Sequence, residues 1–247
     1  MFRKDGWYRS ILYAPAHRDN LENVFANTPA DVVMLDLEDG VPLADKPAAR
    51  VKATELAKRD WPPLVALRVN KADSGMIPED LECFGPGIGA VILPKAERVA
   101  DLQDIDRRLT EKEKALGIET GRTKIIALVE SCLGALEAAN LARATPRLLT
   151  LGIGASDFMA DIGSPVSRAT LDPEALSLPR RMLVLAARAA GLSGPFDGGQ
   201  FPPGRPGWGE ACDMVRRIGF QGKVCFDDAQ AAEANAVFSA REGEKLL

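Results

Sequence analysis

Short runs of aliphatic and β-branched residues recur along this chain, and a stretch with helical spacing separates each run from the next. In one such stretch, Ala49, Ala53, Leu56 and Ala57 fall on a single helical face. This alternation of strands and helices is typical of a parallel sheet covered by helices. The seven apolar runs are Ser10–Tyr13, Val32–Leu37, Leu64–Val69, Ala90–Leu93, Ile125–Val129, Leu148–Leu151 and Lys223–Phe226.

An eighth strand is expected near Gly194–Asp197, where the apolar signal is weaker. Eight strand–helix units in 247 residues fit a TIM barrel better than a doubly wound sheet, because no GxGxxG motif follows the first strand. We therefore predict an α/β fold with one (β/α)8 barrel domain over residues 1–238 and a flexible C-terminal tail over 239–247. The prolines of Gly194–Gly209 predict a long ordered loop there.

Charge and hydropathy restrict the partners of this chain. The 31 basic and 35 acidic residues give a net charge of −4, which offers no general attraction for nucleic acid. No apolar run approaches the roughly 18–20 residues that span a bilayer, and no signal-peptide pattern follows Met1. We expect a cytoplasmic protein that contacts neither nucleic acid nor a membrane.

The scarcity of histidine restricts the chemistry. His17 is the single histidine of the sequence, which excludes multi-histidine metal sites and disfavours a Ser-His-Asp hydrolase. Acid–base chemistry would therefore rest on carboxylates, lysines and arginines. The cysteines form no CxxC pair, so we expect them to be reduced and mostly buried; they are Cys83, Cys132, Cys212 and Cys225.

In a TIM barrel, reactive residues follow the carboxyl ends of the strands. Glu130 and Asp157 end neighbouring predicted strands, which lie about 4.8 Å apart, so the two carboxylates can share one divalent cation. Mg²⁺ suits such a pair because it accepts one or two carboxylates together with water and substrate oxygens. The alternative is that Glu130 pairs with Lys95 or Arg68 and that Asp157 caps a helix starting near Phe158.

Arg68 lies at the carboxyl end of the third predicted strand and can hold a substrate carboxylate or stabilise an enolate oxygen. Its alternative role is that of a buried partner for Asp36 or Glu38. Asp36, Glu38 and Asp39 place three negative charges within four residues, and their repulsion requires nearby cations. Arg68 and Lys95 are the expected neighbours.

The glycine-rich segment Gly152-Ile153-Gly154-Ala155 follows the sixth predicted strand. Its main-chain N–H groups can bind a carboxylate, although a plain turn explains the same pattern.

Several motifs, in order from Arg9 to about Gln230, resemble the citrate lyase beta subunit and malyl-CoA lyase family, which lies within the HpcH/HpaI aldolase superfamily. The resemblance is carried by Arg9–Arg18, Leu35-Asp36-Leu37-Glu38-Asp39-Gly40-Val41, Lys46-Pro47-Ala48-Ala49-Arg50, Arg68-Val69-Asn70, Leu93-Pro94-Lys95, Ala127–Glu130, Gly154–Asp157 and Gly219–Lys223.

The resemblance implies a Mg²⁺-dependent TIM barrel that assembles as a trimer or hexamer and acts on acyl-CoA thioesters. The implied reaction is the reversible cleavage of a 3-hydroxyacyl-CoA, such as a citryl-, citramalyl- or malyl-CoA, to an acyl-CoA and a 2-oxo acid. The roles it implies are metal ligands for Glu130 and Asp157, a carboxylate or enolate clamp for Arg68, a catalytic polar shell for Glu38, Asp39 and Lys95, and substrate binding for Gly154, Ala155, Asp36 and Arg9.

This sequence departs from the family pattern near its C-terminus. The Ile-His-Pro segment usual after Gly222-Lys223 is replaced here by Cys225-Phe226-Asp227. The C-terminal helical segment, whose aspartate serves as the acid–base group, has no counterpart before Leu247. The proton-transfer role therefore stays open among four aspartates, and two alternatives remain, a CoA-independent 2-oxo-acid aldolase and a catalytically degenerate ligand-binding subunit. The four aspartates are Asp36, Asp39, Asp227 and Asp228.

Overall fold

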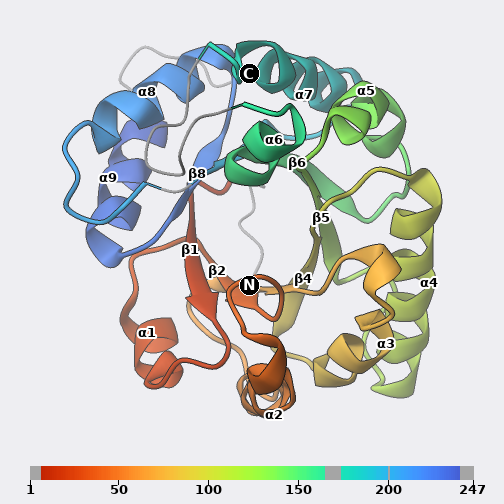
Figure 1. Cartoon of the computed structure of the whole chain (residues 1–247). Coiled ribbons are helices and arrows are strands. Elements are labelled where there is room, and N and C mark those ends of the chain that lie inside the picture. Colours follow the sequence, from red (N-terminus) through yellow and green to blue (C-terminus); the bar gives the residue numbers. More distant parts are fainter. Residues whose placement is uncertain (1–6, 165–173, 200, 240–247) are drawn as a thin grey trace.

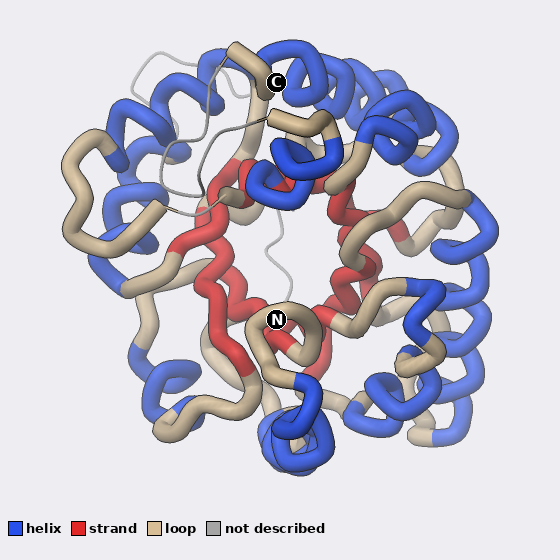
Figure 2. Tube along the Cα trace, in the orientation of Figure 1, coloured by secondary structure: helices blue, strands red, loops and turns tan. Residues whose placement is uncertain are grey.

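Parallel strands β1 to β8 pair in chain order and close into one barrel. The ring is closed between β1 and β8, where Ile11 pairs with Val224. Figure 2 shows the strands as an inner ring with most of the helices outside it. This architecture confirms the predicted TIM barrel. The structure is a computed structural model, and it describes residues 7–164, 174–199 and 201–239.

The strands are β1 (Ser10–Pro15), β2 (Val32–Asp36), β3 (Leu64–Arg68), β4 (Ile88–Leu93), β5 (Lys124–Val129), β6 (Leu148–Gly154), β7 (Phe196–Gly198) and β8 (Gly222–Cys225). The α-helices of the described residues are α1 (Leu21–Asn27), α2 (Lys46–Leu56), α3 (Ile77–Asp80), α4 (Val99–Ala115), α5 (Cys132–Leu141), α6 (Ala155–Asp161), α7 (Ser177–Ala189), α8 (Trp208–Ile218) and α9 (Asp228–Phe238). Short 3₁₀ turns cover Leu43–Asp45, Ala72–Ser74 and Leu81–Cys83.

Each apolar run of the sequence forms a strand, and the weak eighth signal is also a strand, β7. The predicted loop over Gly194–Gly209 is therefore wrong at its start, because β7 occupies Phe196–Gly198 and pairs with both β6 and β8. β6 continues to Gly154, three residues beyond its predicted end. Glycine lacks the side chain that marks a strand in a sequence, which explains why the pattern missed this extension. The last helix ends at Phe238; residues 240–247 of the predicted tail lie outside the described residues.

Alternate strand residues face the inside and the outside of the barrel. The interior is filled by a small apolar cluster that includes Ile11, Met34, Ala66 and Leu128. A larger cluster lies between the strands and the surrounding helices. On α2, the predicted apolar face is confirmed, because Ala49, Ala53 and Leu56 are buried. Both clusters hold the strand ends in fixed positions, and those ends carry the polar residues considered next.

The connection after β6 differs from the other strand–helix units. Helix α6 lies inside the outer ring of helices, next to the end of the barrel (Figure 1). Asp157 lies in the first turn of this helix and lines the cavity described below.

The cysteines are free, and most of them are buried, as expected. Cys83, Cys212 and Cys225 are buried without disulfide partners, while Cys132 is exposed at the start of α5. In the described ranges, none of the helices combines the length and the apolar character of a bilayer-crossing segment.

Candidate active site

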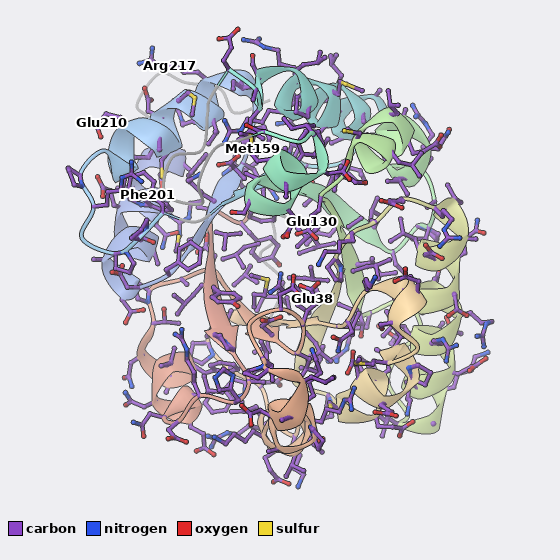
Figure 3. All side chains as sticks on the ribbon, in the orientation of Figure 1. Glu38, Glu130, Met159, Phe201, Glu210 and Arg217 are labelled. Carbon is purple, nitrogen blue, oxygen red and sulfur yellow. The ribbon has the colours of Figure 1, made fainter. Side chains whose placement is uncertain are left out.

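A cavity of about 470 Å³ opens at the carboxyl ends of the barrel strands. Its wall includes side chains of Tyr13, Arg68, Glu130, Asp157 and Phe226. Tyr13, Arg68 and Glu130 occupy the next inward-facing positions after the apolar residues Ile11, Ala66 and Leu128. The change from apolar to polar side chains along these three strands therefore places Tyr13, Arg68 and Glu130 at the carboxyl end of the apolar interior. Figure 3 shows Glu130 and Glu38 at the opening of the barrel.

Glu130 and Asp157 both line this cavity, as the metal-site prediction requires. Glu130 directly follows β5 and is 4% exposed, and Asp157 lies in the first turn of α6. Gly154, at the end of β6, lies against the glutamate: a Cβ atom on Gly154 would stand 2.1 Å from Oε1 of Glu130. A glycine is thus needed at this position to leave room for the carboxylate.

Asp36, Glu38 and Asp39 form ion pairs with Arg68 or Lys95, and the carboxylates of Glu130 and Asp157 differ from them in this respect. Oε2 of Glu130 accepts a hydrogen bond from the main-chain N–H of Lys95 at 3.0 Å. Among the described residues, neither Glu130 nor Asp157 forms an ion pair. Burial, followed by the charges of Glu38 and Asp157, raises the pKa of Glu130 to about 8 despite the opposing charges of Arg68 and Lys95.

This donor set fits a hard divalent cation. A cation near Glu130 and Asp157 would relieve their repulsion and favour the charged form of the glutamate. Within the described residues, no group of three or more His, Cys, Asp or Glu side chains is placed to bind a metal ion. An ion held by these two carboxylates would therefore take its other ligands from water and substrate, which is the coordination habit of Mg²⁺.

Arg68 is held between two carboxylates from the β2 side of the cavity. Its Nε donates to Oδ1 of Asp36 at 2.6 Å, and its Nη1 lies 3.1 Å from Oε2 of Glu38. Burial alone would lower the pKa of Arg68, but the charges of Asp36 and Glu38 raise it above its usual range. The guanidinium therefore stays charged. Arg68 pairs with Asp36 and Glu38 and also lines the cavity, so its structural role does not prevent it from binding a substrate carboxylate or an enolate oxygen.

Asp36 is fully buried and accepts four hydrogen bonds. The donors are Nε of Arg68, the Tyr13 hydroxyl at 3.1 Å, and the main-chain N–H groups of Glu38 and Gly40 at 2.9 and 3.0 Å. These four contacts make Asp36 a structural acceptor that holds Arg68, Tyr13 and the main chain after β2 in place. The structure therefore places Asp36 behind Arg68 and Tyr13, outside the cavity wall.

Lys95 connects the two halves of the site. Its ammonium lies 2.6 Å from Oε1 of Glu38 and 2.8 Å from Oδ2 of Asp39, while its main-chain N–H reaches Glu130. Lys95 adopts φ of 49°, an uncommon conformation for a residue with a side chain. Burial would lower the pKa of Lys95, but its hydrogen bonds to Asp39 and Glu38 raise it above the usual range. The predicted association of Lys95 and Arg68 with the acidic cluster is thus observed.

Some predicted residues are not at this site. Arg9 precedes β1 at the opposite end of the barrel, where its guanidinium binds Asp31 through Nε and Nη2, both at 2.8 Å. It also donates to the Ser239 hydroxyl, so the structure assigns Arg9 to packing between β1 and the end of α9. Asp227 caps α9 by accepting from the N–H of Gln230, and Asp228 accepts from the Thr28 hydroxyl.

The sequence reasoning missed several members of the cavity wall. Tyr13 and Phe226 stand edge to face with ring centres 5.7 Å apart, and Met34 and Ser156 also line the cavity. Burial and the neighbouring Asp36 raise the pKa of Tyr13 above its usual range, so its hydroxyl stays neutral. The inward alternation of the strands gave a usable signal for Tyr13 and Phe226, since each lies two residues beyond an interior apolar residue.

Comparison with known proteins gives a consistent set of relatives. A model of the HpcH/HpaI aldolase/citrate lyase family matches residues 9–198. The citrate lyase subunit beta of Haemophilus influenzae is 32% identical over 240 residues, which cover 94% of this chain and 79% of that protein. The (3S)-malyl-CoA thioesterase of Cereibacter sphaeroides is 31% identical over 242 residues, covering 96% and 79%. The solved structure of the citrate lyase beta subunit from M. tuberculosis, complexed with oxaloacetate and magnesium, matches with a TM-score of 0.76 and 28% identity over 95% of this chain and 98% of that one.

Proposed function

Since this chain belongs to the HpcH/HpaI aldolase/citrate lyase family, we propose that it is a Mg²⁺-dependent carbon–carbon lyase acting on a 3-hydroxyacyl-CoA. The products would be an acyl-CoA and a 2-oxo acid. The observation that supports this proposal most is the pair Glu130 and Asp157, which line one cavity and form no ion pair within the described residues. The related structure that holds oxaloacetate and magnesium supports the same ligand class.

Glu130 and Asp157 would hold the Mg²⁺, which when bound polarises the oxygen atoms of the oxo acid or of its hydroxyl precursor. Arg68 is charged and lines the cavity, so it would bind the substrate carboxylate or neutralise the negative charge that develops on oxygen as the bond breaks. The main chain at Gly154 and Ala155 lines the same cavity and would orient the oxo acid. Tyr13 and Phe226 would shield the reacting atoms from water.

Proton transfer requires a carboxylate that faces the substrate. Of the four aspartates considered from the sequence, Asp39 lines the cavity, whereas Asp36 is saturated with donors and Asp227 and Asp228 serve local contacts. Burial would raise the pKa of Asp39, but Lys95 holds it below its usual range, so Asp39 is ionised. In the cleavage direction, Asp39 would accept the 3-hydroxyl proton and return it to the enolate carbon of the departing thioester.

Turnover assays on citryl-, citramalyl- and malyl-CoA test the lyase assignment. Glu130→Ala should abolish Mg²⁺-dependent formation of the acyl-CoA and the 2-oxo acid. Glu137→Ala in the neighbouring helix α5 is the matched control and should retain turnover. Unchanged turnover of Glu130→Ala would contradict the assignment of Glu130 as a Mg²⁺ ligand.

The thioesterase among the relatives favours a second candidate, hydrolysis of the thioester bond. The two reactions differ in their products, because hydrolysis releases free CoA and a hydroxy acid while cleavage yields an acyl-CoA and an oxo acid. A thiol reagent that detects free CoA, used beside an oxo-acid assay, distinguishes them. Oxo acid without free CoA supports the lyase.

We also propose that the chain forms a homo-oligomer in the cytoplasm. The neighbouring helices α5 and α7 support self-association, since they expose Leu133, Leu136, Leu178 and Leu185, each at least half exposed. Light scattering of the purified protein tests the assembly, and a monomeric mass at micromolar concentration would contradict it. Cell fractionation tests the location.

A further inference from the structure

Lys46, at the start of α2, is a buried cation outside the cavity wall. It is 8% exposed, and its ammonium makes three hydrogen bonds. The acceptors are the main-chain oxygens of Leu37 and Glu38, at 2.7 and 2.9 Å, and Oδ1 of Asn70 at 2.7 Å. An ammonium has three N–H donors, so every donor of Lys46 is used inside the protein.

These acceptors belong to the two segments that present the acidic cluster and Arg68. Leu37 and Glu38 follow β2, and Asn70 lies two residues beyond Arg68 at the end of β3. The two segments are also joined directly, because the N–H of Leu37 donates to the carbonyl of Arg68 at 3.0 Å. Lys46 thus connects the segment after β2 with the end of β3, the two segments whose side chains form the Arg68–Glu38 ion pair.

A second pair, between the buried Asp80 and the partly exposed Arg50, holds Asn70 in place. Oδ2 of Asp80 accepts from the main-chain N–H and from Nδ2 of Asn70, at 2.7 and 2.8 Å. Oδ1 of Asp80 binds Nε and Nη2 of Arg50, at 2.9 and 2.8 Å, and Asp80 is fully buried. Arg50 lies one turn after Lys46, so α2 anchors this network through both residues.

We propose that Lys46, through Asn70, Asp80 and Arg50, is a positioning residue that fixes Glu38 and Arg68 for substrate binding. These four residues do not line the cavity, so they act through Glu38 and Arg68. Glu130 directly follows β5 and Asp157 lies in α6, and the hydrogen bonds given for Lys46, Asn70, Asp80 and Arg50 reach neither residue. Loss of Lys46 should therefore weaken substrate binding more than Mg²⁺ binding; this part rests on the proposed function.

Hydrogen exchange of the main-chain amides tests the network without any assumption about activity. The N–H groups of Glu38 and Gly40 are bound to Asp36, which makes them reporters of the segment after β2. In Lys46→Met, amides of residues 37–40 should exchange about tenfold faster or more, as in a local opening. Lys58→Met is the control, because Lys58 is exposed and pairs with Glu55 alone among the described residues. Unchanged exchange in residues 37–40 of Lys46→Met would overturn the proposal.

Calorimetry with MgCl₂, and then with oxaloacetate in the presence of Mg²⁺, separates positioning from a general structural role. Lys46→Met should bind oxaloacetate about tenfold more weakly while its Mg²⁺ affinity changes by less than about threefold. Asn70→Ala should reproduce this split, and it serves as the second variant if Lys46→Met does not fold. Equal losses for Mg²⁺ and oxaloacetate would overturn the proposal. Absence of oxaloacetate binding in the unmodified protein would instead contradict the proposed function, and amide exchange then decides the role of Lys46.

Discussion

The main chain of Lys95 donates a hydrogen bond to Oε2 of Glu130 at 3.0 Å. The same residue reaches Glu38 with its ammonium, so one lysine contacts both the proposed metal ligand and the acidic cluster that holds Arg68. The uncommon φ of Lys95 makes both contacts available at once. The segment after β4 therefore lies between the proposed metal ligand and the residues that hold Arg68.

Gly154→Ala should disturb the proposed metal site without changing either of the proposed ligands. The added Cβ would stand 2.1 Å from Oε1 of Glu130, so the carboxylate must move. We expect Mg²⁺ affinity, measured by calorimetry, to fall by about tenfold or more, as for other disturbances of metal-ligand placement. Gly209→Ala in α8 is the control, because its Cβ meets the flexible end of Glu233. Equal Mg²⁺ affinities in the two variants would contradict the geometry.

Arg68→Lys should retain the positive charge but lose part of the ion-pair geometry. A lysine cannot reproduce the separate contacts that Nε makes with Asp36 and Nη1 makes with Glu38. We expect turnover to fall by about 10²-fold, as when a transition-state donor is lost. The rate of oxo-acid formation at saturating Mg²⁺ checks this. A variant with the normal rate would show that charge alone suffices.

Arg9→Ala should affect stability and leave chemistry intact. Arg9 binds Asp31 at the end of the barrel opposite the cavity, and Asp31 is largely buried. Loss of the Nε and Nη2 contacts with Asp31 should lower the free energy of unfolding by about 1–3 kcal/mol. Urea denaturation measures this loss, and turnover below the midpoint of unfolding should stay normal. A selective loss of substrate affinity in Arg9→Ala would contradict this structural role and support the predicted role of Arg9 in substrate binding.

The buried network around Asp197 predicts a loss of stability in acid. Burial would raise the pKa of Asp197, but Lys223 and Arg180 outweigh it and hold the pKa below its usual range. Because the folded pKa is below the unfolded value of about 3.9, this stabilisation is present above that pH and is lost as the pH falls through the folded pKa.

Asp197→Asn gives the corresponding comparison. The variant should unfold about 3–5 kcal/mol more easily at pH 7, because it leaves buried cations without their carboxylate. The difference from the unmodified protein should shrink as the pH falls below about 4, because Asp197 is protonated first in the unfolded chain and only at lower pH in the folded protein. Urea denaturation at several pH values measures the difference, and a difference independent of pH would contradict the assignment.

The sequence was most informative where burial imposes a regular pattern. Continuous apolar runs predicted the strands, because parallel strands in a barrel are covered on both faces. β7 gave a weak signal, since its three residues, Phe196, Asp197 and Gly198, include one apolar side chain of any size. The outward-facing Asp197 is buried and pairs with Lys223 and Arg180, which are distant in sequence. No local sequence pattern therefore indicates that Asp197 belongs to a strand.

The candidate site was predictable in its location and in its ionic members. Arg68 ends β3, Glu130 follows β5 and Asp157 follows β6, and these positions were sufficient to place the three side chains at one rim, because parallel strands bring their carboxyl ends together. The division of labour among the aspartates was not predictable. Asp36 and Asp39 are three residues apart, yet Asp36 is enclosed by four donors and Asp39 faces the cavity. That difference depends on Tyr13 and Arg68, whose contacts with Asp36 arise only when β1 and β3 pair with β2.

The central claim is that Glu130 and Asp157 together bind one divalent cation that a 2-oxo acid completes. The most direct test is a crystal structure of the protein grown with Mn²⁺ and oxaloacetate, with the anomalous signal of Mn²⁺ used to locate the ion. The account predicts one anomalous peak bonded to both carboxylates and to the oxo acid. A peak elsewhere in the protein, or no peak between these two side chains at saturating Mn²⁺ and oxaloacetate, would contradict it.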